Sequence, residues 1–239
     1  MRGKNNYFQF KHFRINQAKA AMKVSTEACI LGGYCQEENP TNILDIGTGT
    51  GLLAMMLHQK YPQASITALE IEENTFAQAQ ENIENAFLSE KISLLKQSVQ
   101  DFAHQSRQKF NLIVCNPPFY KNHLLSENEQ RNIALHQQTL SLEELAQCLG
   151  QLLAAKGLAY ILLPAYQMQE FLIFAEAKGL FPVKILEIYH SQKHQIFRYI
   201  IAFGFFKKHI EAEKLCIKNI DETYTEQFRQ LLKDFYLAF

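Results

Sequence analysis

Two short segments carry the residue types that could do chemistry. Residues 42–51 read N-I-L-D-I-G-T-G-T-G, an apolar run that contains an acid and then alternates glycine with threonine. Residues 116–119 read N-P-P-F, an amide and two prolines before an aromatic ring. The first segment predicts a loop that holds a small ligand. The second predicts a set of hydrogen-bond acceptors that presents a planar amine to that ligand.

The glycine-rich segment is expected to be a strand-to-helix turn, because residues 43–46 predict a buried strand and residues 52–60 a helix. Glycines let the backbone approach a ligand closely, and a helix start offers unpaired N–H groups. The spacing D-x-G-x-G-x-G differs from the G-x-G-x-x-G of dinucleotide sites, and an acid before the turn disfavours pyrophosphate. Asp45 therefore suits a cationic amino-acid group.

A second predicted strand, residues 65–70, ends in Glu70, whose carboxylate is well placed to accept two ribose hydroxyls. A glycine-rich turn by itself can be only a tight turn. The combination with Asp45 and Glu70 at these offsets favours a nucleoside site instead.

The N-P-P-F segment suits activation of an exocyclic amine, a poor nucleophile because its lone pair is delocalised into the ring. The Asn116 side-chain oxygen and the Pro117 carbonyl would accept its two hydrogens and aim the lone pair at an electrophilic methyl group. Pro118 restricts Pro117 to an extended backbone. Phe119 can stack on a base, with Tyr120 beside it. The alternative is an ordinary proline turn after a strand.

Strands and helices alternate after residue 41, which predicts an α/β fold with a mostly parallel sheet covered on both faces. The last two strands are expected to form an antiparallel pair at the sheet edge, and the two A-K-G triplets at 155–157 and 177–179 are each expected to end a helix. Seven strands are predicted, at residues 43–46, 65–70, 92–95, 110–115, 158–163, 181–189 and 196–206.

Length and composition describe an ordinary globular chain of 239 residues, 47% hydrophobic and 20% charged. One domain is expected, with residues 1–40 as a basic arm and short helix and residues 41–239 as a Rossmann-like core. No run is long enough to span a membrane and the N-terminus lacks the apolar stretch of a signal peptide, so a cytoplasmic location is expected. The five cysteines form no C-x-x-C pair, and nothing completes a metal site around His190 and His194.

The N-terminal arm is strongly basic: residues 1–26 hold six Lys or Arg residues and no acid. Cations with interleaved rings suit single-stranded nucleic acid, and Lys11 and Arg14 are the candidate phosphate contacts. The alternative is structural, since the aromatic stretch at residues 7–10 can also pack as an edge strand. Both readings remain open from the sequence.

Taken together, D-I-G-T-G-T-G, Glu70 and N-P-P-F resemble class I S-adenosylmethionine-dependent methyltransferases that modify amino groups. Residues 21–32 and 224–236 are more specifically similar to bacterial tRNA1(Val) adenine-37 N6-methyltransferases, and the resemblance spans nearly the whole chain. It implies a Rossmann-like sheet of seven strands, S-adenosylmethionine as cofactor, and the anticodon loop of a valine tRNA as partner. Neither a metal nor a membrane is implied.

The resemblance also implies roles for residues that match the family's motifs. The cofactor would be bound by Lys23, Thr26, Glu27, Asp45, Gly47, Thr48, Gly49, Gly51, Glu70, Ile71, Ser98, Val99 and Asn116. The target adenine would be held by Asn116, Pro117, Pro118 and Phe119. The RNA would be contacted by Lys11, Arg14, Tyr120, Arg131 and His136.

Three positions depart from the family pattern. Ser98 stands where an acid usually flanks the cofactor adenine, with Asp101 three residues on; Asn111 stands where Asp is common; Leu135 stands where a second basic residue is frequent. Three other functions stay open. They are methylation of a protein glutamine, whose enzymes share N-P-P-Y, methylation of ribosomal RNA, and RNA binding without catalysis.

Overall fold

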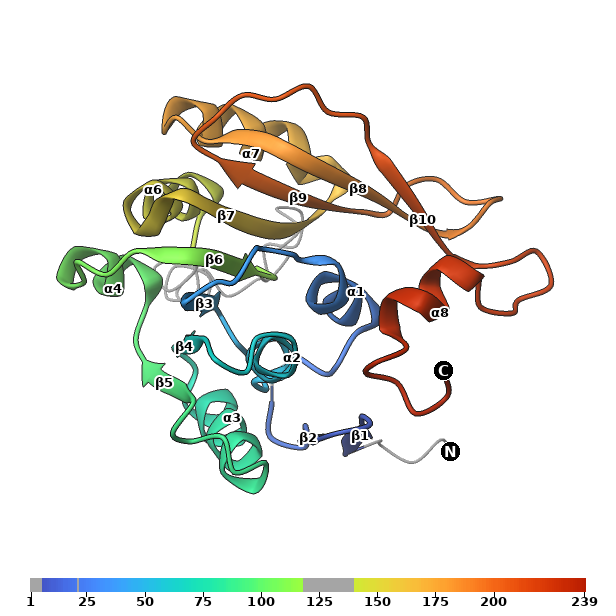
Figure 1. Cartoon of the computed structure of the whole chain (residues 1–239), viewed down its shortest axis with the longest axis horizontal. Helices are drawn as coiled ribbons and strands as arrows, with labels where there is room; N and C mark the ends of the chain where they lie inside the picture. The colour runs from blue at the N-terminus through green and yellow to red at the C-terminus, as the bar shows by residue number, and fades with distance from the viewer. Residues whose placement is uncertain (1–5, 21, 118–139) are drawn as a thin grey trace, which may run out of the picture.

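The computed structural model of the chain describes residues 6–20, 22–117 and 140–239, and its centre is a sheet of eight strands (Figure 1). The strand order is β10-β8-β9-β7-β6-β3-β4-β5. The strands are β3 (Asn42–Ile46), β4 (Ser65–Glu70), β5 (Ile92–Lys96), β6 (Phe110–Cys115), β7 (Leu153–Pro164), β8 (Phe181–Ser191), β9 (Arg198–Gly204) and β10 (Glu213–Lys218).

The sheet confirms the α/β, mostly parallel fold and corrects two details. It has eight strands rather than seven, because β10 adds to the edge beside β8 and runs parallel to it. The antiparallel strand is β9, which pairs with β7 on one side and β8 on the other and so is not at the edge. The hairpin between β8 and β9 was predicted, but β10 covers the side of β8 that was expected to be free.

Helices cover both faces of the sheet, and each face has its own apolar core. The core on one face includes residues of α1, α2, α3 and α8, and the core on the other includes residues of α4, α6 and α7 (Figure 1). The helices are α1 (Thr26–Tyr34), α2 (Leu52–Lys60), α3 (Glu73–Asn85), α4 (Val99–Gln105), α6 (Leu142–Leu152), α7 (Ala165–Ala177) and α8 (Glu226–Leu232). None of the helices in the described ranges is long and apolar enough to cross a bilayer.

The two A-K-G triplets have different structures. Gly179 follows α7 with a φ of +73°, the left-handed conformation expected after a helix end, so this prediction is confirmed. The first triplet was misread, because α6 ends at Leu152 and residues 155–157 lie inside β7. A Cβ on Gly157 would lie 2.7 Å from the Asn111 carbonyl oxygen, so this glycine permits close approach of β7 to β6.

The N-terminal arm is folded against the body of the protein. Strands β1 (Tyr7–Gln9) and β2 (Arg14–Asn16) form a small antiparallel sheet of their own. Phe10 is fully buried, stacks on Phe13 at 4.6 Å between ring centroids, and forms an isolated β-bridge with Tyr236. The structural reading of these rings is therefore confirmed, although they pack against the C-terminal segment and not on the main sheet.

Candidate active site

The predicted site residues converge because they follow neighbouring strands at one edge of the sheet. The end of β3, Ile46, is paired with Leu69 of β4 and with Cys115 of β6. Gly47, Glu70 and Asn116 come at or directly after these positions, so they share the carboxyl edge. Ligands of open α/β sheets bind at this edge.

The glycine-rich loop has the open form that ligand binding requires. Gly47 and Gly49 have φ values of +67° and +60°, a region that side chains with a Cβ rarely adopt. A Cβ added to either glycine would meet no atom of the described residues within 4 Å, so this part of the chain leaves room for a ligand beside the loop. The Thr48 N–H donates to the Leu69 carbonyl at 2.8 Å, which fixes the loop to β4.

Asp45 is fully buried beneath the loop and is only partly hydrogen-bonded. Its Oδ2 accepts from the Thr48 hydroxyl at 2.5 Å and from the Ala54 N–H at 3.0 Å. Its Oδ1 is buried and has no hydrogen-bond partner within the described ranges of the chain. Burial raises the pKa of this carboxyl to about 7, despite the two hydrogen bonds that lower it. A cationic group at Oδ1 would restore the ionised form.

Glu70 braces the same loop from the end of β4. Its Oε2 accepts from the Gly49 N–H at 3.0 Å, and its Oε1 accepts from the backbone N–H groups of Ile71 and Glu72. The carboxylate is thereby held at the carboxyl edge, with lone pairs left to accept ribose hydroxyls. The Ile71 side chain is 52% exposed, an apolar surface suited to pack against a flat ring.

Ser98 and Asp101 are bonded to one another. Ser98 caps α4: its hydroxyl accepts from the Asp101 N–H at 3.0 Å and donates to the Asp101 carboxylate at 2.7 Å. Position 98 therefore lacks the usual acid, but its serine hydroxyl is hydrogen-bonded to the carboxylate of Asp101. Val99 is buried below this turn.

The segment before the sheet lies near the same edge. Ser25, rather than Thr26, is the N-cap of α1, and its hydroxyl accepts from the Ala28 N–H. Glu27, in the first turn, lies 3.9 Å from the guanidinium of Arg198 at the start of β9. Because Arg198 pairs with the end of β7, this contact places the start of α1 at the carboxyl edge. Thr26 and Lys23 are exposed.

Asn116 directly follows β6, and the environment of its side-chain oxygen is unusual. Its Oδ1 atom is buried and has no hydrogen-bond partner among the residues that the structure describes, and Pro117 beside it is buried. A buried acceptor without a donor costs about 1–3 kcal/mol. The geometry fits an acceptor kept ready for a ligand amine. Pro118, Phe119, Tyr120, Arg131, His136 and Leu135 lie outside the described residues.

The two arm residues proposed for RNA differ in their surroundings. The Lys11 ammonium donates to the backbone oxygens of Lys233 and Phe239 at 2.5 and 2.7 Å, so it fastens the arm to the C-terminal segment. Arg14 is exposed, with its guanidinium 4.2 Å from the centroid of the Tyr7 ring. Arg14 is therefore better placed than Lys11 to meet a phosphate.

Asn111 proves to be structural, which removes one departure from the site. Its side-chain oxygen accepts from the Thr41 and Asn42 N–H groups and from the Thr41 hydroxyl. These contacts lie where β3 begins, at the opposite edge of the sheet. Within the described ranges no group of three potential metal ligands is present, and His190 and His194 have ring centroids 6.1 Å apart.

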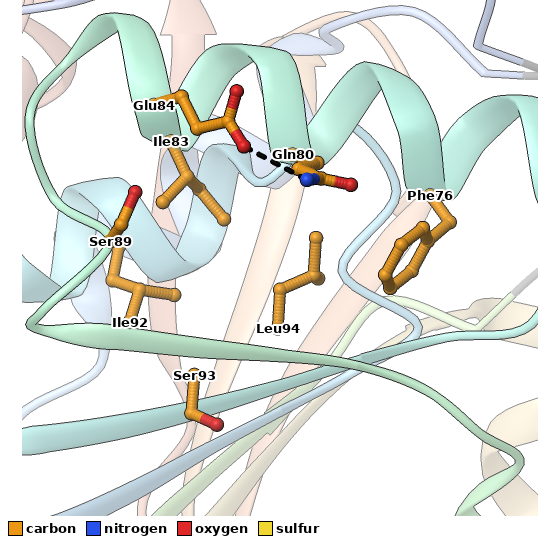
Figure 2. Close-up of a pocket in the computed structure, with 8 residues that line it drawn as sticks. All are labelled: Phe76, Gln80, Ile83, Glu84, Ser89, Ile92, Ser93 and Leu94. Carbon is orange, nitrogen blue, oxygen red and sulfur yellow. Dashed lines mark hydrogen bonds between the residues drawn. The ribbon is translucent and has the colours of Figure 1, made fainter.

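A groove of about 340 Å³ separates α3 from the edge strand β5, and Figure 2 shows its lining. It contains the apolar side chains of Phe76, Ile83 and Leu94 and a hydrogen bond from Gln80 to Glu84 at 2.8 Å. None of the predicted cofactor or catalytic residues lines it. This groove is separate from the site at the carboxyl edge.

Sequence reasoning missed the role of α3 in holding the site. Gln78 and Asn82 lie on its buried side, with exposures of 1% and 0%. Asn82 hydrogen-bonds to the backbone of both Asn16 and Thr50, and Thr50 belongs to the glycine-rich loop. Two amide residues one turn apart on the apolar face of a helix were the available signal.

Comparison with known proteins agrees with this geometry. The family model described as "Methyltransferase small domain" matches residues 24–144. The crystal structure of a predicted O-methyltransferase from Agrobacterium tumefaciens has a TM-score of 0.64 at 16% identity, covering 87% of this chain and 95% of that one. The fold is thus that of a class I methyltransferase.

Relatives that match nearly the whole chain identify a more specific family. A protein of Flavobacterium psychrophilum is 35% identical over 96% of this chain and 99% of its own length, and one of Cytophaga hutchinsonii is 37% identical over 98% of each. Both are named tRNA1(Val) (adenine(37)-N6)-methyltransferase. The chain belongs to this family of methyltransferases.

The residues present fit S-adenosylmethionine, the cofactor of this class of enzyme. The unpaired Oδ1 of Asp45 suits its ammonium group, and no atom of the described residues lies within 4 Å of where a Cβ on Gly47 or Gly49 would be. The Glu70 carboxylate suits its ribose hydroxyls, and the exposed Ile71 suits its adenine.

Proposed function

We propose that this protein transfers a methyl group from S-adenosylmethionine to N6 of adenine 37, next to the anticodon of tRNA1(Val). The observation that carries the proposal is the buried, unpaired Asn116 oxygen at the end of β6, next to the strand that leads into the glycine-rich loop. Relatives that match nearly the whole chain and bear this activity in their names support the choice of substrate.

The cofactor supplies an electrophilic methyl group on a sulfonium sulfur. The N–H groups of the glycine-rich loop and the Asp45 carboxylate hold its amino-acid end, and Glu70 holds its ribose. These contacts would hold the cofactor at the carboxyl edge of the sheet, where β6 also ends. Binding energy is thereby used for orientation.

Asn116 and Pro117 act on the other reactant. The Asn116 side-chain oxygen and the Pro117 carbonyl accept the two N6 hydrogens of the adenine, which turns the nitrogen lone pair toward the methyl carbon. As the nitrogen–carbon bond forms and the carbon–sulfur bond breaks, the nitrogen gains positive charge. Two acceptors fit that charge better than they fit the neutral amine, so they stabilise the transition state. The nitrogen then loses one proton to water.

The test uses purified protein, radiolabelled S-adenosylmethionine and bulk tRNA from a strain that lacks its own enzyme of this family. We expect label in N6-methyladenosine of the valine tRNA after nucleoside analysis. Ribosomal RNA and total protein serve as competing substrates in parallel reactions. Label that appears in either of these and not in tRNA would keep the methyltransferase chemistry and overturn the proposed substrate.

A further inference from the structure

The side chain of Asn82, in α3, joins the N-terminal arm to the cofactor loop. Its Oδ1 accepts from the Asn16 N–H at 2.8 Å, and its Nδ2 donates to the Asn16 carbonyl at 2.9 Å. The second hydrogen on Nδ2 goes to the Thr50 carbonyl, also at 2.9 Å. Both donors and the oxygen of this amide are therefore used, in a side chain with no solvent exposure.

Thr50 lies in the glycine-rich loop, between β3 and α2, where the backbone is outside the hydrogen-bond pattern of a strand or a helix. The preceding Gly49 is held by Glu70, and the Gly51 N–H donates to the Thr48 carbonyl. Asn82 supplies the fastening on the side of α3, so the loop is braced from β4 and from α3. Such bracing favours ligand binding, because a loop that is already ordered loses less conformational entropy when the ligand binds.

Asn16 is the last residue of β2, and the chain from there leads to the predicted cofactor segment. The Lys19 N–H donates to the Gln78 side chain at 3.1 Å, and the Val24 N–H donates to the Gln17 side chain at 2.9 Å. Three amide side chains thus fix residues 16–24 to α3 and to each other. Asn82 differs from the other two because its side chain also donates to the glycine-rich loop, at the Thr50 carbonyl.

We propose that Asn82 is a positioning residue: it holds the glycine-rich loop in its cofactor-binding shape by fastening it to the N-terminal arm. The proposal rests on S-adenosylmethionine being the ligand of that loop. It makes the arm, which carries the proposed RNA contact Arg14, and the cofactor loop parts of one hydrogen-bonded unit. Asn82 touches neither the reacting amine nor the methyl group in this assignment.

The test measures the dissociation constant of S-adenosylmethionine by calorimetry, without RNA and without turnover. Asn82→Ala should raise it about tenfold, which is about 1.4 kcal/mol of binding free energy. Gln78→Ala is the matched control, since it removes an equally buried amide that holds the same arm and makes no bond to the loop. Gln78→Ala should change the dissociation constant by less than about threefold, although both variants lower the melting temperature.

The outcomes separate this inference from the proposed function. Wild-type protein that does not bind S-adenosylmethionine would overturn both. Wild-type binding with equal affinity in Asn82→Ala, or an equal loss in Gln78→Ala, would overturn the inference alone and leave Asn82 a merely structural residue.

Hydrogen exchange of the wild-type protein gives a second readout that needs no variant to fold. S-adenosylmethionine should slow exchange of the Asn16 N–H, which donates to Asn82, as well as exchange in the loop itself. Protection confined to residues 47–51 and absent at Asn16 would contradict the proposed coupling.

Discussion

Replacing Asn116 with alanine is expected to slow methyl transfer by about two to three orders of magnitude while the cofactor still binds and the fold stays intact. The variant removes one of the two acceptors proposed to stabilise positive charge on the amine. Loss of one such preorganised group costs about 10²–10³ in rate in other enzymes, or about 2.7–4 kcal/mol. We expect a single-turnover methylation rate lower by that factor.

Stability should respond in the opposite sense to an ordinary core truncation. The Asn116 Oδ1 atom is buried and unpaired, so it destabilises the ligand-free protein by about 1–3 kcal/mol. Removing it offsets the packing lost with the side chain. The free energy of unfolding should be unchanged, or higher by about 1 kcal/mol, in a urea titration of the cofactor-free variant.

Three measurements on the same preparation decide the point: the single-turnover rate, the dissociation constant of S-adenosylmethionine, and the unfolding free energy. Asn116→Asp is the matched control, because it keeps an acceptor oxygen and should keep more activity than alanine. Full activity in Asn116→Ala would refute the proposed mechanism. A rate loss matched by an equal loss of cofactor binding would assign Asn116 to the cofactor and not to the amine.

Three further predictions follow from the loop, the carboxyl beneath it and the arm. Burial raises the pKa of Asp45 to about 7, above the unfolded value of about 3.9, so the folded protein retains a proton that the unfolded chain has lost between these values. The free energy of unfolding should therefore fall as pH rises from about 4 to 7, and Asp45→Asn should remove this part of the pH dependence in urea titrations. Gly49→Ala should lower the free energy of unfolding by about 1–2 kcal/mol, because alanine is strained at a φ of +60°. It should also weaken cofactor binding, because the new methyl group enters the space proposed for the ligand. Equal cofactor affinity of the variant and the wild type by calorimetry would place the ligand elsewhere. Arg14→Glu should lower tRNA affinity and reduce the slope of log affinity against log salt by about one or more. Arg107→Glu, in the exposed segment before β6, is the control and should leave the slope unchanged. Equal slopes for both variants in filter binding would make the arm purely structural.

The central strands and the chemistry-bearing ends of those strands could be predicted because their signals are local. Residues 43–46 and 110–115 are mostly apolar and buried, apart from half-buried Asn111, and each run is followed at once by a loop of special composition. The predicted bounds differ from β3 by one residue and from β6 by none. Because parallel strands end at the same edge of the sheet, the loops that follow them are expected to lie close together.

The edge of the sheet could not be predicted in the same way. β10 reads E-K-L-C-I-K, with only Leu215 and Ile217 buried and charges at both ends. Charged ends are typical of edge strands, which have a neighbour on one side only. Pairing with β8 decides this strand, and that partner is more than twenty residues away in the chain.

The identical A-K-G triplets show why local sequence has a limit. Gly179 has open space around it and supplies the left-handed turn that ends α7. Gly157 has backbone carbonyls of β6 within 2.8 Å of where a Cβ would be, so close packing of two strands requires it. Both glycines are needed, for physical reasons that only the tertiary structure separates.

The polar groups of the site divide into satisfied and unsatisfied ones, and the division matches their proposed roles. Asn82 has partners on the chain for both its donors and its oxygen, so it can hold the loop whether or not a ligand is present. Asp45 and Asn116 each keep one buried oxygen without a partner, at the ends of adjacent strands. Each unpaired oxygen costs about 1–3 kcal/mol, a cost that disappears when a donor arrives. The two donors this arrangement calls for are a cationic ammonium at Asp45 and a planar amine at Asn116, which are groups of the proposed cofactor and of the proposed base.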